Sequence, residues 1–250
     1  MSKLLQMDGD ADIATVAALM GEPSRAAVLV ALADGRALAA STLAVEAGVA
    51  PSTLSGHLAR LVDGGLISVE PSGRHRYFRL AAPEVAQAVE ALARVAPSRP
   101  IRSLRQATHA SAIRQARTCY DHLAGRLGVA ICDSLLNSEI VRVETNPGMA
   151  ADPIVGAGRS NQYVITEYGK ERLKDLGVEL DQSSRRPLVL YCLDWSEQRP
   201  HLGGRLGAAL LNRFIVLGWM IQADRRVIRI TKDGQTGLCQ EFAIDTVALQ

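Results

Sequence analysis

The segment from Pro51 to Val62, PSTLSGHLARLV, separates its apolar and polar positions as an amphipathic helix does. Leu54, Leu58 and Leu61 fall on one stripe at helical spacing. The opposite face is small and polar, ends in a cation and holds Thr53, Gly56, His57 and Arg60. This division predicts a helix that packs through its leucines and offers short donors and acceptors to a groove. An ordinary surface helix has the same pattern, so the neighbouring segments decide its role.

Helical spacing predicts three shorter helices before this one: residues 11–20, a helix capped by Ser24, and residues 39–47. Gly48 ends the third helix, and Pro51 suits the first turn of the next one. A short helix, a glycine-containing turn and a helix with a polar face form a helix-turn-helix arrangement.

After Gly64 and Gly65 the apolar period becomes that of a strand. Residues 66–70 and 74–80 flank ProSerGly, which predicts a β-hairpin over residues 66–80. Its tip and returning strand carry Arg74, His75, Arg76 and Arg79. A basic hairpin directly after the second helix is the wing of a winged helix-turn-helix, because such a tip approaches phosphates. Residues 84–96 predict a further amphipathic helix, either a dimer element or a helix packed on its own domain.

Composition limits the possible partners. Apolar residues make up 48% and charged residues 22%, as in ordinary globular proteins. Aromatic residues make up only 4%, which disfavours proteins that stack the bases of RNA or of single strands. The net charge of +2 does not by itself indicate nucleic-acid binding. The sequence shows no secretory signal and no apolar run of membrane-spanning length, so we expect a cytoplasmic protein with reduced cysteines and no membrane partner.

The second half of the chain contains a duplication. Residues 119–131, CYDHLAGRLGVAI, and residues 192–210, CLDWSEQRPHLGGRLGAAL, share Cys-x-Asp followed by His-Leu-x-Gly-Arg-Leu-Gly. Each copy continues to Ile-Thr-x-x-Gly. We therefore expect an α+β, mainly α, protein: a winged helix-turn-helix in residues 1–100, then two related α/β units at 101–180 and 181–250. Each unit would be a helix plus a small hairpin, like half of a winged helix, with a cleft between the two units.

The repeats place sulfur, oxygen and nitrogen atoms at equivalent positions: Cys119, Asp121, His122, Cys192, Asp194 and His201. Such a set suits zinc or another borderline metal. The same residues have structural roles if cysteine packs as a small apolar residue and aspartate caps the following helix. Two other interpretations are a thiol sensor using Cys119 or Cys192 and an organic ligand near Tyr120, Tyr191, Trp195 and Trp219. Cys132 and Cys239 are not equivalent, and we expect both to be structural.

Residues 11–96 resemble the ArsR/SmtB (arsenic-repressor-like) family of winged-helix transcriptional regulators. The resemblance rests on GEPSRAAVLVAL, STLAVEAGV, TLSGHLARLVDGGLI and RHRYFRL. It implies a homodimeric repressor that binds double-stranded operator DNA and releases it when a metal, metalloid or other effector binds. It places the recognition helix, residues 51–64, in the major groove through Ser52, Thr53, Ser55, Gly56, His57 and Arg60. It places the wing, residues 66–80, on the flanking backbone through Arg74, His75 and Arg76. Arg60 is the best candidate for reading guanine.

The chain departs from this family at the usual sensing sites. The helix before the recognition helix, ALAASTLAVEA, has no cysteine, and PEVAQAVEALARVA has no histidine or aspartate. We therefore expect the signal to act on the duplicated half. One alternative is a ligand-independent DNA-binding protein whose C-terminal half only dimerises or recruits a partner. A second is an enzyme using the duplicated Cys/Asp/His sites, but duplication favours binding over a single active site, so we expect no enzyme.

Overall fold

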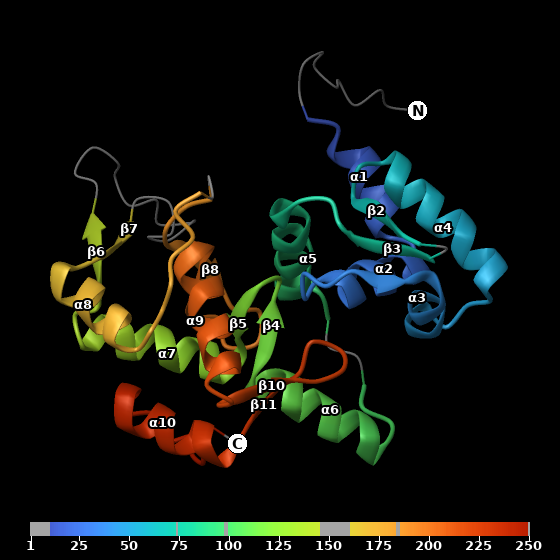
Figure 1. Ribbon diagram of the computed structural model, residues 1–250. Coiled ribbons are helices and arrows are strands. Elements are labelled where there is room, and N and C mark those ends of the chain that lie inside the picture. The colour runs from blue at the N-terminus through green and yellow to red at the C-terminus, as the bar shows by residue number, and fades with distance from the viewer. Residues whose placement is uncertain (1–10, 74, 98–99, 146–160, 184–185, 250) are drawn as a thin grey trace. The chain divides into compact units, whose positions relative to one another are not determined.

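The computed structural model describes residues 11–73, 75–97, 100–145, 161–183 and 186–249 (Figure 1). The chain divides into two compact units, Met1–Val89 and Glu90–Gln250. No single helix in these ranges is long and apolar enough to cross a membrane; the pair Ile13–Met20 and Pro23–Leu32 meets that criterion only when joined across an 89° bend.

The first unit has the order expected of a winged helix-turn-helix. Its elements are α1 (Ile13–Met20), α2 (Pro23–Leu32), β1 (Leu38–Ala39), α3 (Ala40–Ala47), α4 (Pro51–Asp63), β2 (Ile67–Ser72), β3 (His75–Leu80) and the start of α5 (Pro83–Val95). The strands form an antiparallel sheet in the order β1-β3-β2. Its core contains Leu29, Leu43, Leu54, Leu61 and Phe78, each no more than 2% exposed.

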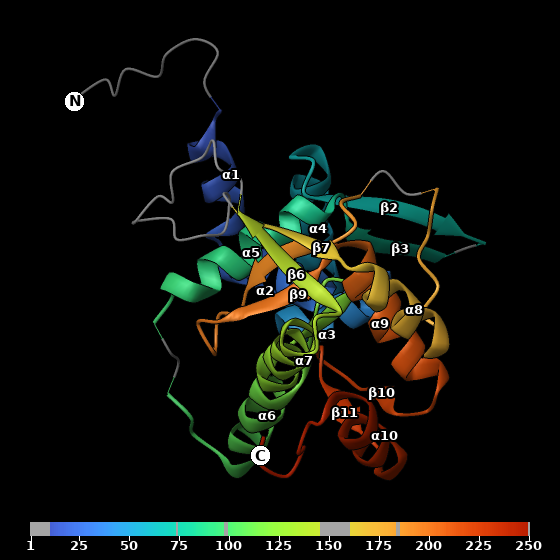
Figure 2. The ribbon, with the colours of Figure 1, turned by 90° about the vertical axis from the view of Figure 1, so that its left-hand side faces the viewer.

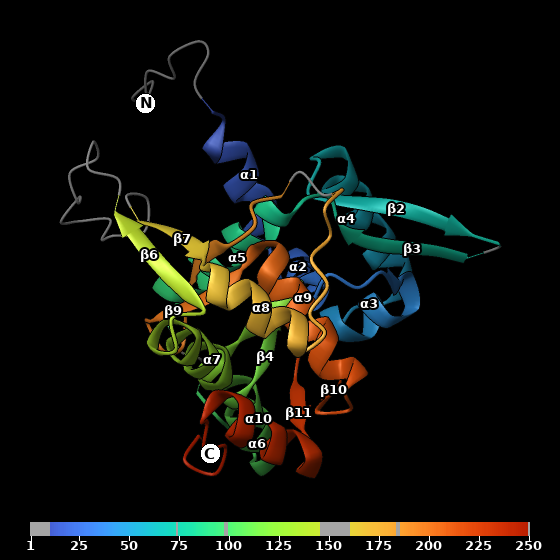
Figure 3. The ribbon, with the colours of Figure 1, turned by 60° about the vertical axis from the view of Figure 1, so that its left-hand side comes forward.

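Two local predictions in this unit were wrong. Glu22 rather than Ser24 caps α2, because Pro23 takes the first helical position and the Glu22 carboxylate accepts a hydrogen bond from the Arg25 amide at 2.8 Å. Pro71 and Ser72 were expected in the turn but belong to β2, which extends to Ser72 and pairs there with His75 of β3. Figures 2 and 3 show β2 and β3 running together to that tip.

The second unit contains the duplication as two copies of one motif, a hairpin, a helix, a second hairpin and a second helix. It begins with the end of α5 and with α6 (Leu104–Gln115). The first copy comprises β4 (Arg117–Cys119), β5 (His122–Ala124), α7 (Gly125–Asn137), β6 (Val141–Thr145), β7 (Asn161–Ile165) and α8 (Glu167–Asp175). The second comprises β8 (Leu190–Leu193), β9 (Pro200–Gly203), α9 (Gly204–Val216), β10 (Met220–Gln222), β11 (Ile228–Ile230) and α10 (Lys232–Phe242).

The two copies pack reciprocally. Helix α7 packs against β9 of the other copy, α9 packs against β5, and β5 also contacts β9. Each helix also lies close against the hairpin of its own copy, because its fourth residue is glycine. A Cβ atom on Gly128 would lie 2.5 Å from the Leu123 carbonyl oxygen, and one on Gly207 would lie 2.2 Å from that of Leu202. Both copies contribute to a single core, which includes Leu127, Leu135, Leu206 and Phe214.

The Ile-Thr-x-x-Gly signature marks the start of the last helix in each copy. Thr166 accepts a hydrogen bond from the Gly169 amide at 2.8 Å, and Thr231 accepts one from Gly234 at 3.0 Å. Each threonine thereby caps its helix. A Cβ atom on either glycine would lie 2.1 Å from a carbonyl oxygen, that of Ile140 or of Trp219. The signature therefore encodes a helix cap combined with a close backbone approach.

Candidate nucleic-acid interface and candidate metal centre

Helix α4 presents the polar face that its sequence predicts. Leu54, Leu58 and Leu61 are buried, which fixes the helix on its own unit. The preceding turn is set by Gly48, whose φ of +65° ends α3 in the left-handed conformation. Five residues of the predicted contact set are exposed on the opposite face: Ser52, Thr53, Ser55, Gly56 and Arg60.

His57 belongs to the same predicted set but is held from within the unit. Its side chain is 16% exposed, and Nδ1 lies 3.3 Å from Oε2 of Glu22. Desolvation opposes ionisation of Glu22, but hydrogen bonds from the Arg25 and Ser24 amides, together with His57, lower the pKa of this carboxyl. The pair joins α4 to the beginning of α2, a contact that needs no nucleic acid.

The wing carries cations with different partners. His75, Arg76 and Arg79 are exposed on β3, whereas Arg74 lies outside the described residues. Arg79 is paired with Glu70 on β2, with Nη1 and Oε1 3.0 Å apart. The Arg76 guanidinium carbon lies 5.8 Å from the centre of the Phe78 ring.

In the second unit, the repeated cysteines and histidines come together. Cys119 and His122 are register partners across β4 and β5, and Cys192 and His201 are register partners across β8 and β9. One potential ligand atom from each of these four residues lies within 4.8 Å of the other three. We call them the Cys₂His₂ cluster. The two sulfur atoms are 3.8 Å apart, and the two imidazole rings stack with their centres 5.1 Å apart.

The Cys₂His₂ cluster is largely buried, and each of its imidazoles has at least one nitrogen without a hydrogen-bond partner among the described residues. Cys119, His122 and His201 are 2%, 5% and 0% exposed, and Cys192 is half-buried. Within the described part of the chain, Nε2 of His122 and both ring nitrogens of His201 have no hydrogen-bond partner. Buried polar atoms are normally hydrogen-bonded, so these three unpaired nitrogens mark the cluster as a candidate binding site.

The repeated aspartates lie behind the histidine rings rather than in the cluster. Asp121 forms a two-pronged ion pair with Arg186, and its Oδ1 is 3.4 Å from Nδ1 of His122. Asp194 Oδ2 accepts hydrogen bonds from the Gly125 amide at 2.6 Å and from Arg117 at 2.9 Å. The same oxygen is 3.6 Å from Nδ1 of His201. The structure thus brings together four of the six residues predicted as a sensor site. The two aspartates pair with arginines instead.

These surroundings shift the ionisation of the cluster. The hydrogen bond with Cys192 and burial raise the pKa of the Cys119 thiol to about 12. Burial alone would lower the pKa of His122, but Cys119 and Asp121 outweigh it and raise that pKa to about 9. Burial would raise the pKa of Asp194, but Arg117, the Gly125 amide and Ser196 lower it to about 2. The carboxylate behind His201 is therefore ionised at neutral pH.

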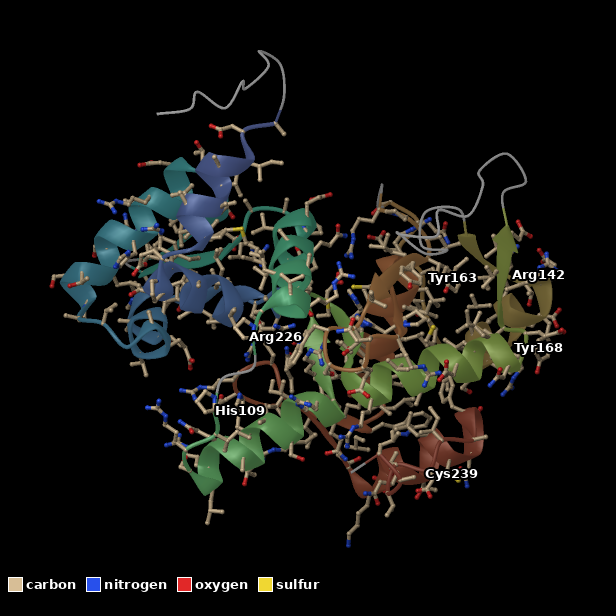
Figure 4. All side chains as sticks on the ribbon, turned by 180° about the vertical axis from the view of Figure 1, so that it is seen from behind. His109, Arg142, Tyr163, Tyr168, Arg226 and Cys239 are labelled. Carbon is tan, nitrogen blue, oxygen red and sulfur yellow. The ribbon has the colours of Figure 1, made fainter. Side chains whose placement is uncertain are left out.

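A buried ionic network next to the cluster was missed from the sequence. Arg117 is fully buried; its Nη2 lies 2.9 Å from Asp194 and 3.7 Å from Glu90 of α5. Arg226 pairs with the same glutamate and donates to the Thr118 carbonyl oxygen at 2.9 Å (Figure 4). Arg117 is two positions before Cys119, but the equivalent residue of the other copy, at position 190, is leucine. Comparison of the two repeats therefore did not identify Arg117 as a site residue.

The four aromatic residues predicted near an organic ligand pack elsewhere. Tyr120 faces Arg186, Trp195 faces Arg117, Tyr191 stacks on Tyr163 and Trp219 stacks on Phe214. None of them lines the apolar pocket between the copies, which is lined by Leu123, Gly128, Ile131, Leu202, Gly207, Leu210 and Phe214. Of the remaining cysteines, Cys132 is buried in the core, whereas Cys239 is exposed on α10 and is not a core residue (Figure 4).

The first unit, with its helix-turn-helix followed by a basic hairpin, defines a winged helix-turn-helix DNA-binding protein. Residues 20–70 match a family model described as a helix-turn-helix domain. An uncharacterized HTH-type transcriptional regulator of Bacillus subtilis (strain 168), YdfF, is 37% identical over 228 residues, covering 90% of this chain and 94% of its own. The chain belongs to this family of HTH-type transcriptional regulators. The predicted α+β fold and DNA-binding regulatory function are confirmed.

Two solved structures each match about a third of the chain. Reduced HlyU from Vibrio cholerae is 26% identical, covering 34% of this chain and 88% of its own with a TM-score of 0.31. The cadmium sensor CmtR from Mycobacterium tuberculosis is 30% identical, covering 37% of this chain and 100% of its own with a TM-score of 0.30.

Proposed function

We propose that this regulator is a homodimeric repressor of the cytoplasm that reads operator DNA with α4 and is released by a signal acting on its second unit. The observation that carries the DNA-reading part is the exposed polar face of α4 beside the β2–β3 hairpin. Ser52, Thr53, Ser55 and Gly56 would approach base edges, and Arg60 would donate to guanine. His75, Arg76 and, by sequence, Arg74 would contact the flanking phosphates.

His57 has a different role in this proposal. Its contact with Glu22 holds α4 on α2, so it positions the recognition helix and need not touch a base itself. Without His57, the residues proposed to contact bases are the members of the predicted set that are exposed on α4.

Apolar side chains on the first and fifth helices support dimerisation. Ile13 and Val16 are 75% and 38% exposed on α1, and Leu92 and Val95 are 51% and 80% exposed on α5. Exposed apolar residues gathered on helices are typical of protein–protein interfaces. A dimer would place two α4 helices on half-sites about 34–36 Å apart.

The second unit suits binding better than catalysis. Its distinctive residues form a buried cluster contributed equally by two copies of one motif. The competing function is a regulator whose second unit only dimerises or recruits a partner, without any effector.

Selection of bound duplexes from a random library, followed by footprinting, tests this proposal. We expect a two-fold symmetric site, and Arg60→Ala should lose discrimination at one base pair per half-site by about 1–3 kcal/mol while keeping non-specific affinity. Gln87→Ala is a matched control, because Gln87 is exposed on α5, outside the proposed contact set. Unchanged sequence preference in Arg60→Ala would refute the assigned reading face.

A further inference from the structure

We infer that Cys119, His122, Cys192 and His201 form a four-ligand site for a divalent metal ion of the zinc class, and that this ion is the signal acting on the second unit. The regulatory part of this inference rests on the proposed function; the metal site does not.

The donor set and its spacing fit a tetrahedral ion. Zinc is held by thiolate sulfur at about 2.3 Å and imidazole nitrogen at about 2.0 Å, and two sulfurs on one tetrahedral zinc are then about 3.8 Å apart. The sulfur atoms of Cys119 and Cys192 are separated by 3.8 Å. Two sulfurs and two nitrogens favour zinc or cobalt over magnesium or calcium, which prefer oxygen.

The histidines provide an independent observation. His201 is completely buried and His122 nearly so, yet Nε2 of each ring has no partner among the described residues. A bound cation would pair both nitrogens. On the other side of each ring, Nδ1 lies 3.4 Å from Asp121 or 3.6 Å from Asp194. A carboxylate behind the imidazole is the usual surrounding of a metal-binding histidine, because it fixes the ring and its tautomer.

A disulfide between Cys119 and Cys192 explains less of this arrangement. Disulfide sulfurs lie about 2.0 Å apart, so bond formation would require the sulfurs to move together. It would also leave Nε2 of both histidines without a partner among the described residues. The four protein ligands fill a tetrahedral shell, which is the pattern of a closed binding site rather than of a catalytic metal with an open position.

A chain of buried charged residues connects the metal site with α5, the helix that follows the wing. His201 lies against Asp194, Asp194 pairs with Arg117, and Arg117 faces Glu90. Glu90 belongs to α5, a continuous helix that begins at Pro83, three residues after β3 ends. Metal binding fixes His201 and Asp194, and the fixed carboxylate orders the buried charges at α5.

Cobalt titration of the full-length, reduced and metal-stripped protein tests the site. We expect one Co²⁺ per chain with thiolate-to-cobalt charge-transfer absorption and tetrahedral d–d bands, displaced by Zn²⁺. Cys119→Ser and Cys192→Ser should each bind at least about tenfold more weakly and lose part of the charge-transfer band. Cys239→Ser, whose thiol is exposed on α10 outside the cluster, should bind as the wild type does.

If the serine variants do not fold, X-ray absorption spectroscopy of the zinc-loaded wild-type protein still tests the metal site. Two sulfur and two nitrogen neighbours at the distances above support the site. No stoichiometric binding by the reduced protein, or wild-type affinity and an undiminished charge-transfer band in both serine variants, would overturn it. Operator affinity measured with and without Zn²⁺ tests regulation separately. An unchanged affinity at full metal occupancy refutes the signalling role and leaves the DNA-binding function intact.

Discussion

At the scale of single residues, two exposed arginines on one strand of the wing differ in their partners. Arg79 is paired with Glu70 at 3.0 Å, whereas the Arg76 guanidinium lies over the Phe78 ring. An arginine already paired with a carboxylate adds little net charge toward a phosphate. The paired arginine therefore serves as an internal comparison for the other.

We expect Arg76→Ala to weaken binding to all duplexes about equally and to reduce the slope of log affinity against log salt by about 1, because one phosphate contact is lost. Fluorescence anisotropy across a salt series measures both quantities. Arg79→Ala should change the slope less, because Glu70 offsets its charge. Equal slopes in the two variants would contradict a phosphate contact by Arg76.

At the scale of elements, two glycines within helices have different surroundings. Gly234 lies in the first turn of α10, where a Cβ atom would be 2.1 Å from the Trp219 carbonyl oxygen. Gly56 lies within α4, and a Cβ atom there would have no heavy atom within 4 Å. Close packing explains the first glycine, whereas an open surface surrounds the second.

Alanine at these two positions should shift the free energy of unfolding in opposite directions. Gly234→Ala should destabilise the second unit by about 1–3 kcal/mol through overpacking. Gly56→Ala should stabilise the first unit by about 0.5–1 kcal/mol, because alanine is the better helix former. Urea unfolding followed by circular dichroism measures both. If Gly234→Ala left the free energy of unfolding unchanged, α10 would be able to move away from Trp219 at no energetic cost.

The sequence predicted the longer elements and missed the shorter ones for a physical reason. The leucine spacing of α4 spans several helical turns, so its buried and exposed faces were both predictable. Strands β4 and β5 have only three residues each, too few to show alternation. The hairpins that hold the cluster were consequently not expected. Repeat comparison found all four cluster residues, but it could not show that Arg186 and Arg117 pair with the repeated aspartates from 65 and 77 positions away.

At the scale of the whole molecule, the second unit is one body made from two copies. Its core draws side chains from both, and each first helix packs on the hairpin of the other copy. Neither copy has a complete apolar interior of its own. The two C-terminal units expected from the sequence are therefore repeats of a motif that share one core.

This sharing predicts fragment complementation. Residues 90–183 and 186–250, produced separately, should each lack a cooperative unfolding transition, because each exposes the surface that the other copy covers. Mixed or co-expressed, they should associate and regain one, as calorimetry and size-exclusion chromatography would show. Cooperative unfolding of residues 90–183 alone would contradict the shared core. The intact span 90–250 serves as the control.

The cross-strand pairing of one cysteine with one histidine in each copy also has a symmetry consequence. One copy supplies half of the Cys₂His₂ cluster, so a single copy on its own would need an identical chain across a two-fold axis to complete the cluster. The two copies of this chain are related in the same way within one polypeptide. Their aspartates differ in partners, since Asp194 pairs with a buried arginine and Asp121 with a partly exposed one.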